Sequence, residues 1–505
     1  MTQNNSPRVL AIGLDAAEPT LIRHFMEEGW MPALQRLLER GAWKRVRSPA
    51  VIGSGAVWPT FITGSGPREH GIYGEWEWQP GFMSVKRYSG RGLIPFWKSL
   101  AREGTTIGVL DIPFAPTVGL SEGFEISEWG AHDVIAGQTE VRPESLSALI
   151  SQTRPHPFQA ENVDASGPDD LESLARLRSA CLDGVKLRGE LARRLIQETG
   201  PQLAVVVFTE IHHAAHYFWH AIAPDHPSYA GDKFHAPQET SSRALREIYR
   251  EVDEQIARLV EVAGEDAFTC VFSLHGMRPT FGIPSFLTPL LIETGWAHLA
   301  DWSSQSWRAR LLSLFAAAKR RAPSPLKKLY YKTLPRTATF QLAQTTMLPP
   351  YDWSRTRAFS LPTDQHGWIR LNLVGREAAG VVPPEEYEET CREIERMLLE
   401  LVTEDGEPLV RDCLMTSRGA DEALAQLLPD IVVHYTDAAF RERLKIKGTG
   451  FEAGALGQKF TGQHAPEGFL LAAGAPEIIP DAPVVPAEDL HRLMTAALNL
   501  HTVTH

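Results

Sequence analysis

The sequence predicts an α/β fold in which a largely parallel central sheet is flanked by helices and interrupted by inserted segments. Three observations predict it. Short apolar runs rich in β-branched residues alternate with helical patterns along the chain, which is typical of a parallel sheet. Each run is at most six residues long, as expected of a strand that is buried on both faces. Residues that can bind ligands follow several of these runs, and ligands gather at the carboxyl ends of such strands.

Five runs carry the strand pattern most clearly. They are residues 9–14, 106–110, 203–208, 268–273 and 431–433. Asp15 follows the first run, a cluster of histidines follows the third, and His275 follows the fourth. Because the carboxyl ends of parallel strands meet at one edge of a sheet, we expect these side chains to share a site.

Two stretches interrupt the alternation and divide the chain. The α/β core is expected to comprise residues 7–130, 201–290 and 351–505, with a helical cap insertion at 131–200 and a basic helical insertion at 291–350. The basic insertion has no acidic residue from 302 to 350 and carries nine basic ones from Arg308 to Arg336. Such a stripe could meet a membrane surface or an anionic substrate, but a solvated insertion that packs its Leu and Phe face on the core is the favoured interpretation.

Composition excludes several classes of protein. The 505-residue chain is 43% hydrophobic and 22% charged, with a net charge of −12, which argues against a general nucleic-acid binder. No run approaches the roughly 18 apolar residues of a membrane-spanning helix, and the N-terminus lacks the pattern of a signal peptide. The cysteines are far apart and form no CxxC pair, so we expect reduced thiols and a cytoplasmic protein; a homo-oligomer stays open. They are Cys181, Cys270, Cys391 and Cys413.

The histidine cluster is the segment TEIHHAAHYFWH, residues 209–220. His212, His216 and His220 are spaced by four residues and would share one face of a helix. Two histidines four apart can reach one cation, although nothing in this segment supplies a third ligand. Taken alone, a metal site and a histidine-rich surface turn are equally good interpretations.

A second motif is VIGSGAVWPTFITGSGPREHGIYG, residues 51–74. Ser54 lies between glycines, just before a short helix-like segment that ends at Gly64. It could simply cap that helix. It could also be a nucleophile, with helix N-terminal amides holding the phosphate that it attacks.

The order of these motifs resembles the alkaline phosphatase superfamily, on the branch of type I phosphodiesterases and nucleotide pyrophosphatases. Segments 365–382 and 428–435 share the resemblance, which therefore spans most of the chain. The motifs are, in order, Asp15, Ser54 before Thr63-Gly64, Pro67-x-x-His70-Gly71, His212-x-x-x-His216, His275-Gly276 and Gly462-x-His464-x-x-x-Gly468.

The resemblance implies an alkaline phosphatase-like fold and two divalent metals, commonly zinc, held about 4 Å apart. One metal would be held by His212, His216 and His464, and the other by Asp15, Ser54 and His275. Ser54 would attack phosphorus and become a phosphoserine, which water then releases. The implied substrate is a small-molecule phosphodiester, pyrophosphate or nucleotide-like phosphate ester. His213 and His220 match no ligand position and are expected either to contact the metal ligands or to be structural.

The chain departs from this family at two metal positions. The family usually has Asp where this chain has His212, and Asp again where it has Leu274. Two negative charges are therefore missing. The first site becomes a three-histidine centre, which suits zinc, and the second is expected to bind its ion more weakly, with manganese as an alternative.

A third departure is Glu75, where related nucleotide pyrophosphatases place an Asn that binds a phosphate oxygen. A carboxylate there would repel a phosphate unless it were protonated or paired. Glu75 could act as a general acid, could restore charge to the metal site, or could point away. Glu18 is a weaker candidate for the same role.

The motifs leave several functions open. The favoured function is a metal-dependent hydrolase of phosphodiester or pyrophosphate bonds. A phosphomonoesterase, a sulfatase or a phosphoryl transferase would use the same fold and metals. A degenerate member that binds a ligand without chemistry is the alternative from another class, and Leu274 is its best support.

Overall fold

The computed structural model describes most of the chain as two compact units. The described residues are 6–90, 92–130, 138–160, 170–224, 226, 238–280, 284–301, scattered positions from 307 to 334, 336–362, 365–441, 444–450, 452–453 and 460–503. Unit 1 comprises Met1–His70, Ser89–Pro279 and Thr461–His505. Unit 2 comprises Gly71–Tyr88 and Thr280–Phe460. The core and insertion boundaries expected from the sequence stay a prediction.

Unit 1 is built on one large sheet. Within the described part of the unit the strand order is β19–β2–β18–β9–β1–β8–β5–β6–β7. The five strands from β9 to β6 are parallel to one another, whereas β18 pairs antiparallel with both β9 and β2, and β7 pairs antiparallel with β6. The strands are β1 (Val9–Leu14), β2 (Gly41–Arg47), β5 (Ile107–Leu110), β6 (Phe124–Ser127), β7 (Glu140–Arg142), β8 (Leu203–Phe208), β9 (Phe268–Ser273), β18 (Glu467–Ala473) and β19 (Val484–Pro486). The predicted central sheet is confirmed.

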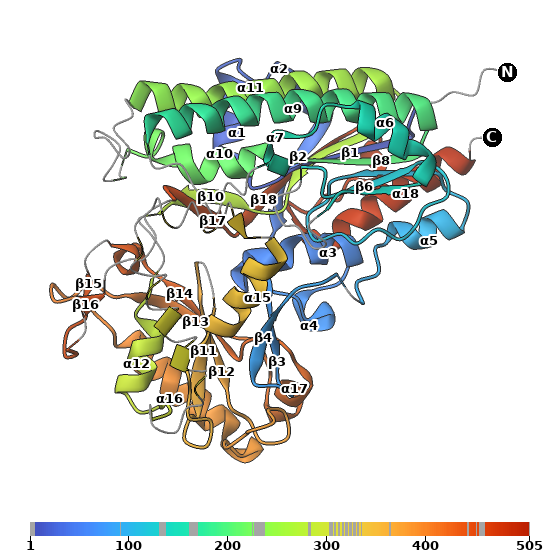
Figure 1. Cartoon of the computed structure of the whole chain (residues 1–505). Coiled ribbons are helices and arrows are strands. Elements are labelled where there is room, and N and C mark those ends of the chain that lie inside the picture. The colour runs from blue at the N-terminus through green and yellow to red at the C-terminus, as the bar shows by residue number, and fades with distance from the viewer. Residues whose placement is uncertain are drawn as a thin grey trace. The chain divides into compact units, whose positions relative to one another are not determined.

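Helices cover both faces of this sheet, and Figure 1 shows the two longest, α9 and α11, side by side on one of them. The helices on that side are α1 (Pro19–Glu27), α2 (Pro32–Glu39), α6 (Ser147–Gln152), α7 (Pro157–Ala160), α9 (Leu171–Thr199), α10 (Glu210–Phe218) and α11 (Gln238–Ala263). Those on the other side are α3 (Val57–Thr63), α4 (Pro67–His70), α5 (Trp97–Arg102) and α18 (Leu490–Val503). A short antiparallel ribbon of β10 (Gly276–Pro279) and β17 (Gly462–Ala465) completes the unit.

Helix α9 is the helix predicted within segment 131–200. It begins at a capping box in which the Asp170 side chain accepts from Ser173 N–H, and it ends at Gly200 in the left-handed conformation. Its apolar side, including Leu177, Leu191 and Ile196, is buried. Since α9 packs within unit 1, this helix forms part of the layer on the central sheet.

Unit 2 has a smaller, antiparallel sheet in the order β11–β12–β14–β13. The fifth predicted strand run, 431–433, belongs to β14 here and not to the parallel sheet. Because β14 has a neighbour on each side and is buried throughout, its apolar run resembles that of a central parallel strand. The elements of unit 2 are β3 (Trp76–Gln79), β4 (Ser84–Arg87), α12 (Leu287–Glu293), α15 (Arg336–Thr346), β11 (Ala358–Leu361), β12 (Gly367–Leu371), α16 (Tyr387–Leu399), β13 (Val410–Met415), α17 (Ala420–Ala425), β14 (Ile431–Tyr435), β15 (Leu444–Lys445) and β16 (Glu452–Ala453).

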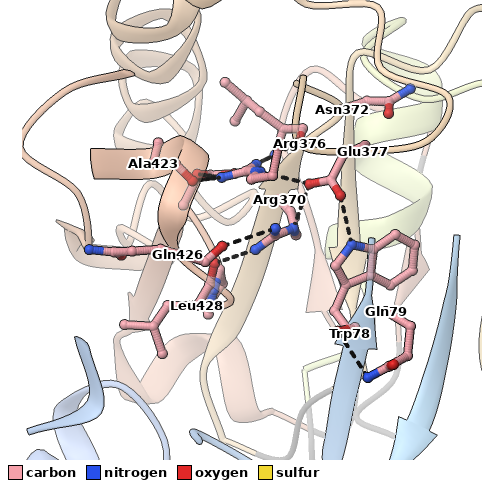
Figure 2. Close-up of polar contacts among 12 residues, drawn as sticks. Trp78, Gln79, Arg370, Asn372, Arg376, Glu377, Ala423, Gln426 and Leu428 are labelled. Atoms are coloured by element: carbon pink, nitrogen blue, oxygen red, sulfur yellow. Dashed lines mark hydrogen bonds and ion pairs between the residues drawn. The ribbon is translucent and has the colours of Figure 1, made fainter. Parts of the chain in front are cut away.

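A buried ionic network holds the loops of unit 2 to its sheet (Figure 2). Arg370 on β12 donates through Nε to Oε1 of Glu377 at 2.7 Å and through Nη1 and Nη2 to two main-chain carbonyl groups. Glu377 also accepts from Trp78 Nε1 at 3.1 Å. Arg376 Nη2 donates to Asp430 Oδ2 at 2.7 Å. Segments 365–382 and 428–435, which share the family resemblance, therefore contribute residues that hold unit 2 together.

Three further expectations from the sequence concern membrane-spanning helices, the cysteines and the basic stripe. No helix among the described residues is long and apolar enough to cross a membrane. All four cysteines are free. Most of the basic stripe from Arg308 to Arg336, including Lys319 and its two neighbouring arginines, lies outside the described residues.

Candidate metal centre

Three neighbouring strands deliver the first candidate residues to one edge of the sheet. β1 lies between β8 and β9. Asp15 directly follows β1, and its N–H donates to the carbonyl oxygen of Phe208, the last residue of β8, at 3.0 Å. Helix α10, which carries His212, begins two residues after β8, and His275 follows β9 by two residues. The prediction that these strand ends share an edge is confirmed.

The ribbon of β10 and β17 brings in the last histidine. Its register places Met277 opposite His464, so His275 and His464 become neighbours with ring centroids 4.6 Å apart. Gly462, at the start of β17, lies against α10, where a Cβ would come within 2.5 Å of the carbonyl oxygen of Ala215. A glycine is therefore required for β17 to approach α10 this closely.

Three imidazole rings converge through their Nε2 atoms. His212 Nε2 lies 2.9 Å from His216 Nε2 and 2.9 Å from His464 Nε2. The Nδ1 atoms face outward to acceptors: that of His212 lies 2.7 Å from Asp15 Oδ2, and that of His216 lies 2.8 Å from the Gly462 carbonyl oxygen. Because each Nδ1 carries the proton that it donates, the Nε2 atoms of neutral His212 and His216 present lone pairs to each other.

Such an arrangement fits a metal ion. Two lone pairs 2.9 Å apart repel each other unless a proton or a metal ion lies between them. Histidine ligands of metals typically donate their other N–H to a carboxylate or a carbonyl group, as His212 and His216 do here. Burial, followed by the proximity of the other three histidines, holds the pKa of His464 well below its ordinary value. His464 is therefore neutral, as a metal ligand must be.

His275 joins this cluster more closely than the sequence implied. Ligand atoms of His212, His275 and His464 all lie within 4.8 Å of one another. The sequence assigned His275 to a second metal with Asp15 and Ser54. The structure thus brings the four predicted histidines into one buried cluster, with Asp15 beside it.

Asp15 is buried and has a donor on each oxygen. Oδ2 faces His212, and Oδ1 accepts from Trp58 Nε1 at 2.9 Å and lies 3.5 Å from His275 Nε2. Burial alone would raise the pKa of Asp15, but His212 and His275 hold that pKa well below its usual range. Asp15 is therefore an anion that orients His212, in addition to its predicted role as a metal ligand.

Trp58 is a residue of this site that the sequence argument missed. Its indole is buried in the segment that carries Ser54. A Cβ on Gly13 would come within 2.9 Å of the indole, so the glycine in β1 makes room for it. Two features of the sequence could have indicated this contact. Trp58 follows the candidate nucleophile by four residues, and Gly13 precedes Asp15 by two residues.

Ser54 begins a short 3₁₀ turn, Ser54–Ala56, that leads into α3. The N-cap of the turn is Gly53 and that of α3 is Ala56, so Ser54 occupies neither cap position. Its side chain is half-buried. Because Trp58 on the next turn contacts Asp15, the segment that carries Ser54 is anchored to the carboxyl end of β1.

The two candidate glutamates have local partners. Glu75 belongs to unit 2, where Arg87 Nη2 donates to its Oε1 at 2.9 Å. This pairing offsets its charge. Glu18 is the N-cap of α1, and its carboxylate accepts from Leu21 N–H at 2.5 Å.

The two remaining histidines of α10 and its extension are buried among aromatic rings. The ring of His213 lies 4.3 Å from that of Phe158, and the ring of His220 lies 6.1 Å from that of His226. Neither belongs to the group of metal-capable side chains found in the described part of the chain.

Comparison with known proteins gives a family and a fold. Solved structures of phosphonoacetate hydrolase from Sinorhizobium meliloti 1021 are similar, at 15% identity and a TM-score of 0.51 with phosphonoformate bound, and at 16% and 0.50 with phosphonoacetate bound. Each alignment covers 98% of this chain and 96% of that chain. Human ectonucleotide pyrophosphatase/phosphodiesterase 5 aligns over 97% of this chain and 95% of its own, at 12% identity and a TM-score of 0.45. No curated protein sequence matches the chain.

The family assignment comes from the sequence itself. Residues 9–462 match the family described as type I phosphodiesterase / nucleotide pyrophosphatase. This range includes Asp15, Ser54 and three of the four clustered histidines, and it ends two residues before His464. The chain belongs to the type I phosphodiesterase/nucleotide pyrophosphatase family of the alkaline phosphatase superfamily, and is a phosphoric ester hydrolase.

Proposed function

We propose that this chain is a metal-dependent hydrolase of phosphodiester or pyrophosphate bonds that acts through a covalent intermediate on Ser54. The observation that carries the proposal is the convergence of three Nε2 atoms, from His212, His216 and His464. Outward-facing partners set the tautomers of two of these rings, those of His212 and His216. A site that binds a metal only adventitiously does not need its ligands oriented in this way.

The donor set favours zinc. Three neutral imidazoles suit zinc and related ions, whereas hard cations prefer oxygen ligands. The second predicted site consists of Asp15, Ser54 and His275, so Asp15 is the one carboxylate in this set. Leu274, next to His275, is buried and apolar and supplies no ligand. We expect one tightly bound zinc and a second, weaker divalent ion, which could be zinc or manganese.

Ser54 is assigned as the nucleophile. Its Oγ would attack phosphorus and displace one ester or anhydride oxygen, leaving a phosphoryl group on the serine, and water would then release that group. A bound metal supplies Lewis acidity at the phosphoryl oxygens and lowers the pKa of hydroxyl groups that reach it. Asp15 holds the His212 tautomer, and Trp58 fixes Asp15 in turn.

Glu75 stays a candidate general acid. Its pairing with Arg87 offsets the repulsion between a carboxylate and a phosphate, but the same arginine favours the ionised form of Glu75 over the protonated acid. Glu75→Gln preserves the shape of the side chain but removes the proton donor. A general-acid role requires that this variant lose most activity on substrates with a poor leaving group and keep it on a nitrophenyl ester.

A substrate panel separates the proposed activity from its relatives. The panel contains a nitrophenyl phosphodiester, a nitrophenyl phosphomonoester, a nitrophenyl sulfate, a dinucleotide pyrophosphate and phosphonoacetate, each assayed with zinc-loaded protein. We expect the highest kcat/KM for the diester or the pyrophosphate, and a phosphoryl adduct on the Ser54 peptide by mass spectrometry after acid quenching. A preference for the monoester, the sulfate or phosphonoacetate would replace the proposed substrate class, and no turnover of any of them would favour a non-catalytic binding member.

A further inference from the structure

Unit 1 contains a second polar cluster that the proposed chemistry does not use. Arg188, Asp111, Glu210 and His156 have fully buried side chains and are joined by ion pairs. Glu210 is the first residue of α10, the helix that carries His212. The cluster therefore lies at the base of the ligand-bearing helix.

Arg188, in the middle of α9, makes the central contacts. Its Nε donates to Glu210 Oε1 at 2.9 Å, and its Nη1 donates to Asp111 Oδ2 at 2.6 Å. Its Nη2 lies 2.9 Å from the Gly130 carbonyl oxygen and 3.3 Å from Thr209 Oγ1. Thr209 also donates to the Gly130 carbonyl oxygen, at 2.9 Å. One guanidinium thus links α9, the residue after β5 and the first turn of α10.

The partners of Arg188 are themselves fixed. Asp111 accepts from the N–H groups of Trp129 and Gly130, at 2.8 and 2.7 Å, and adopts a φ of 56°. A non-glycine residue in this left-handed region is strained and persists only where the surrounding contacts determine it. The strain indicates that the loop is shaped to present the Asp111 carboxylate to the arginine.

The cluster carries one excess negative charge. His156 Nε2 lies 2.8 Å from Glu210 Oε1, while its Nδ1 accepts from Phe158 N–H at 3.2 Å, so the ring is neutral. One guanidinium therefore faces two buried carboxylates, and removing it would leave both without their cation.

Helix α10 needs such an anchor. It has nine residues, and helices of this length are marginal without tertiary contacts. Its last turns are held to β17, because Thr461 N–H donates to the His216 carbonyl oxygen at 2.6 Å and His216 Nδ1 faces Gly462. Its first turn is held by the contacts of Arg188 with Thr209 and Glu210.

We propose that Arg188 is a positioning residue for the metal centre, which fixes the first turn of α10 so that His212 and His216 converge on one ion. The inference rests on the proposed metal-dependent function. It also gives α9 a role beyond covering the sheet, because the helix supplies the anchor of the ligand-bearing helix.

The test compares zinc affinity with stability in the full chain. Arg188→Lys keeps the charge but lacks the planar fork that reaches four partners at once. We expect its zinc dissociation constant, measured by competition with a chelator well below the thermal midpoint, to rise at least about tenfold. The visible absorption spectrum of the cobalt(II)-loaded protein should change with it. Glu210→Gln, which keeps the Arg188–Asp111 pair and the side-chain shape, should raise the dissociation constant several-fold and decides the matter if Arg188→Lys does not fold.

The matched control is Arg370→Lys in unit 2. Arg370 is equally buried and paired with Glu377, but none of the predicted metal ligands lies in its unit. We expect this variant to lower the thermal midpoint while leaving zinc affinity within about twofold of native. Native-like zinc affinity and an unchanged cobalt spectrum in folded Arg188→Lys or Glu210→Gln would overturn the positioning role. Absence of zinc from the native protein would instead overturn the proposed metal centre, and the two failures are therefore distinguishable.

Discussion

The two halves of the candidate site differ in how well this chain supports them. The three-histidine set, His212, His216 and His464, is buried, and its Nε2 atoms converge. The Asp15 set, which is Asp15, Ser54 and His275, depends on a single carboxylate that already accepts hydrogen bonds from His212 and Trp58.

The difference shows how a change in one half of the site affects the other. With a histidine at position 212, Asp15 becomes the acceptor for its Nδ1–H. The carboxylate that would balance a second cation is also absent, because Leu274 stands where the family usually has Asp. The three-histidine set therefore gains Asp15 as a hydrogen-bond partner of His212. The Asp15 set has only this one carboxylate, because Leu274 supplies none.

The largest expected effect comes from removing a ligand of the three-histidine set. His216→Ala and His464→Ala should each leave the protein without tightly bound metal and without activity, because only two of the three convergent Nε2 atoms would remain and His275 is assigned to the second ion with Asp15. His212→Asp is the control, since it restores the ligand that the family usually has, and it should retain metal. Elemental analysis after dialysis measures all three variants, and a native metal content in either alanine variant would contradict the ligand assignment.

Ser54→Ala separates chemistry from metal binding. Turnover should fall to a few per cent of native or less, because the nucleophile is lost. Metal content should stay close to native, because the three histidines remain. If the variant kept more activity than that on the best substrate, direct attack by water on phosphorus would replace the covalent mechanism.

Leu274→Asp sharpens the comparison by returning a carboxylate to the weaker half. Leu274 is only 1% exposed, so an unpaired carboxylate there should cost about 3–5 kcal/mol of folding stability in chelator. Added zinc should recover that stability, tighten the second site and reduce the dependence of activity on added metal. Thermal melts with and without zinc measure this, and equal destabilisation in both conditions would show that residue 274 does not reach a metal.

Trp58→Phe should have the smallest effect. It removes the indole donor on Asp15 Oδ1 but leaves the contact between Oδ2 and His212. Because partners of this kind change metal affinity by about 10–100-fold, we expect the low end of that range at the second site and little change at the first. Isothermal titration with zinc measures the affinity of each site. A loss of affinity confined to the tight site would contradict the assignment of Asp15 to the weaker second site.

Much of the fold and site could be predicted from local sequence. The runs that form β1, β8 and β9 are apolar and short, and each is followed within a few residues by Asp15 or a histidine. Strand ends of this kind are local features of the sequence, and the parallel arrangement then brings them to one edge. The run in β14 was misassigned because burial on both faces gives the same apolar pattern in an antiparallel sheet.

The support of the site could not be predicted in the same way. The proton on His216 is set by a carbonyl group that lies 246 positions away in the sequence, and Asp15 contacts His212 across 197 positions. Arg188 meets Glu210 only because α9 and α10 pack together. Any residue has a main-chain carbonyl group, so the sequence does not show which carbonyl group accepts from His216. Arg188 also could not be recognised as buried, because an arginine within a helical segment looks the same in the sequence whether it is buried or exposed to solvent.

The most direct test of the account is the number of metal ions per native chain. Protein purified without chelators should be analysed for zinc and other divalent metals before and after extended dialysis. The account predicts one zinc per chain that survives dialysis, with the second ion lost first and activity restored by adding it back. Two ions that both resist dialysis would contradict the weakened Asp15 set and indicate a further ligand, and no bound metal at all would contradict the three-histidine centre itself.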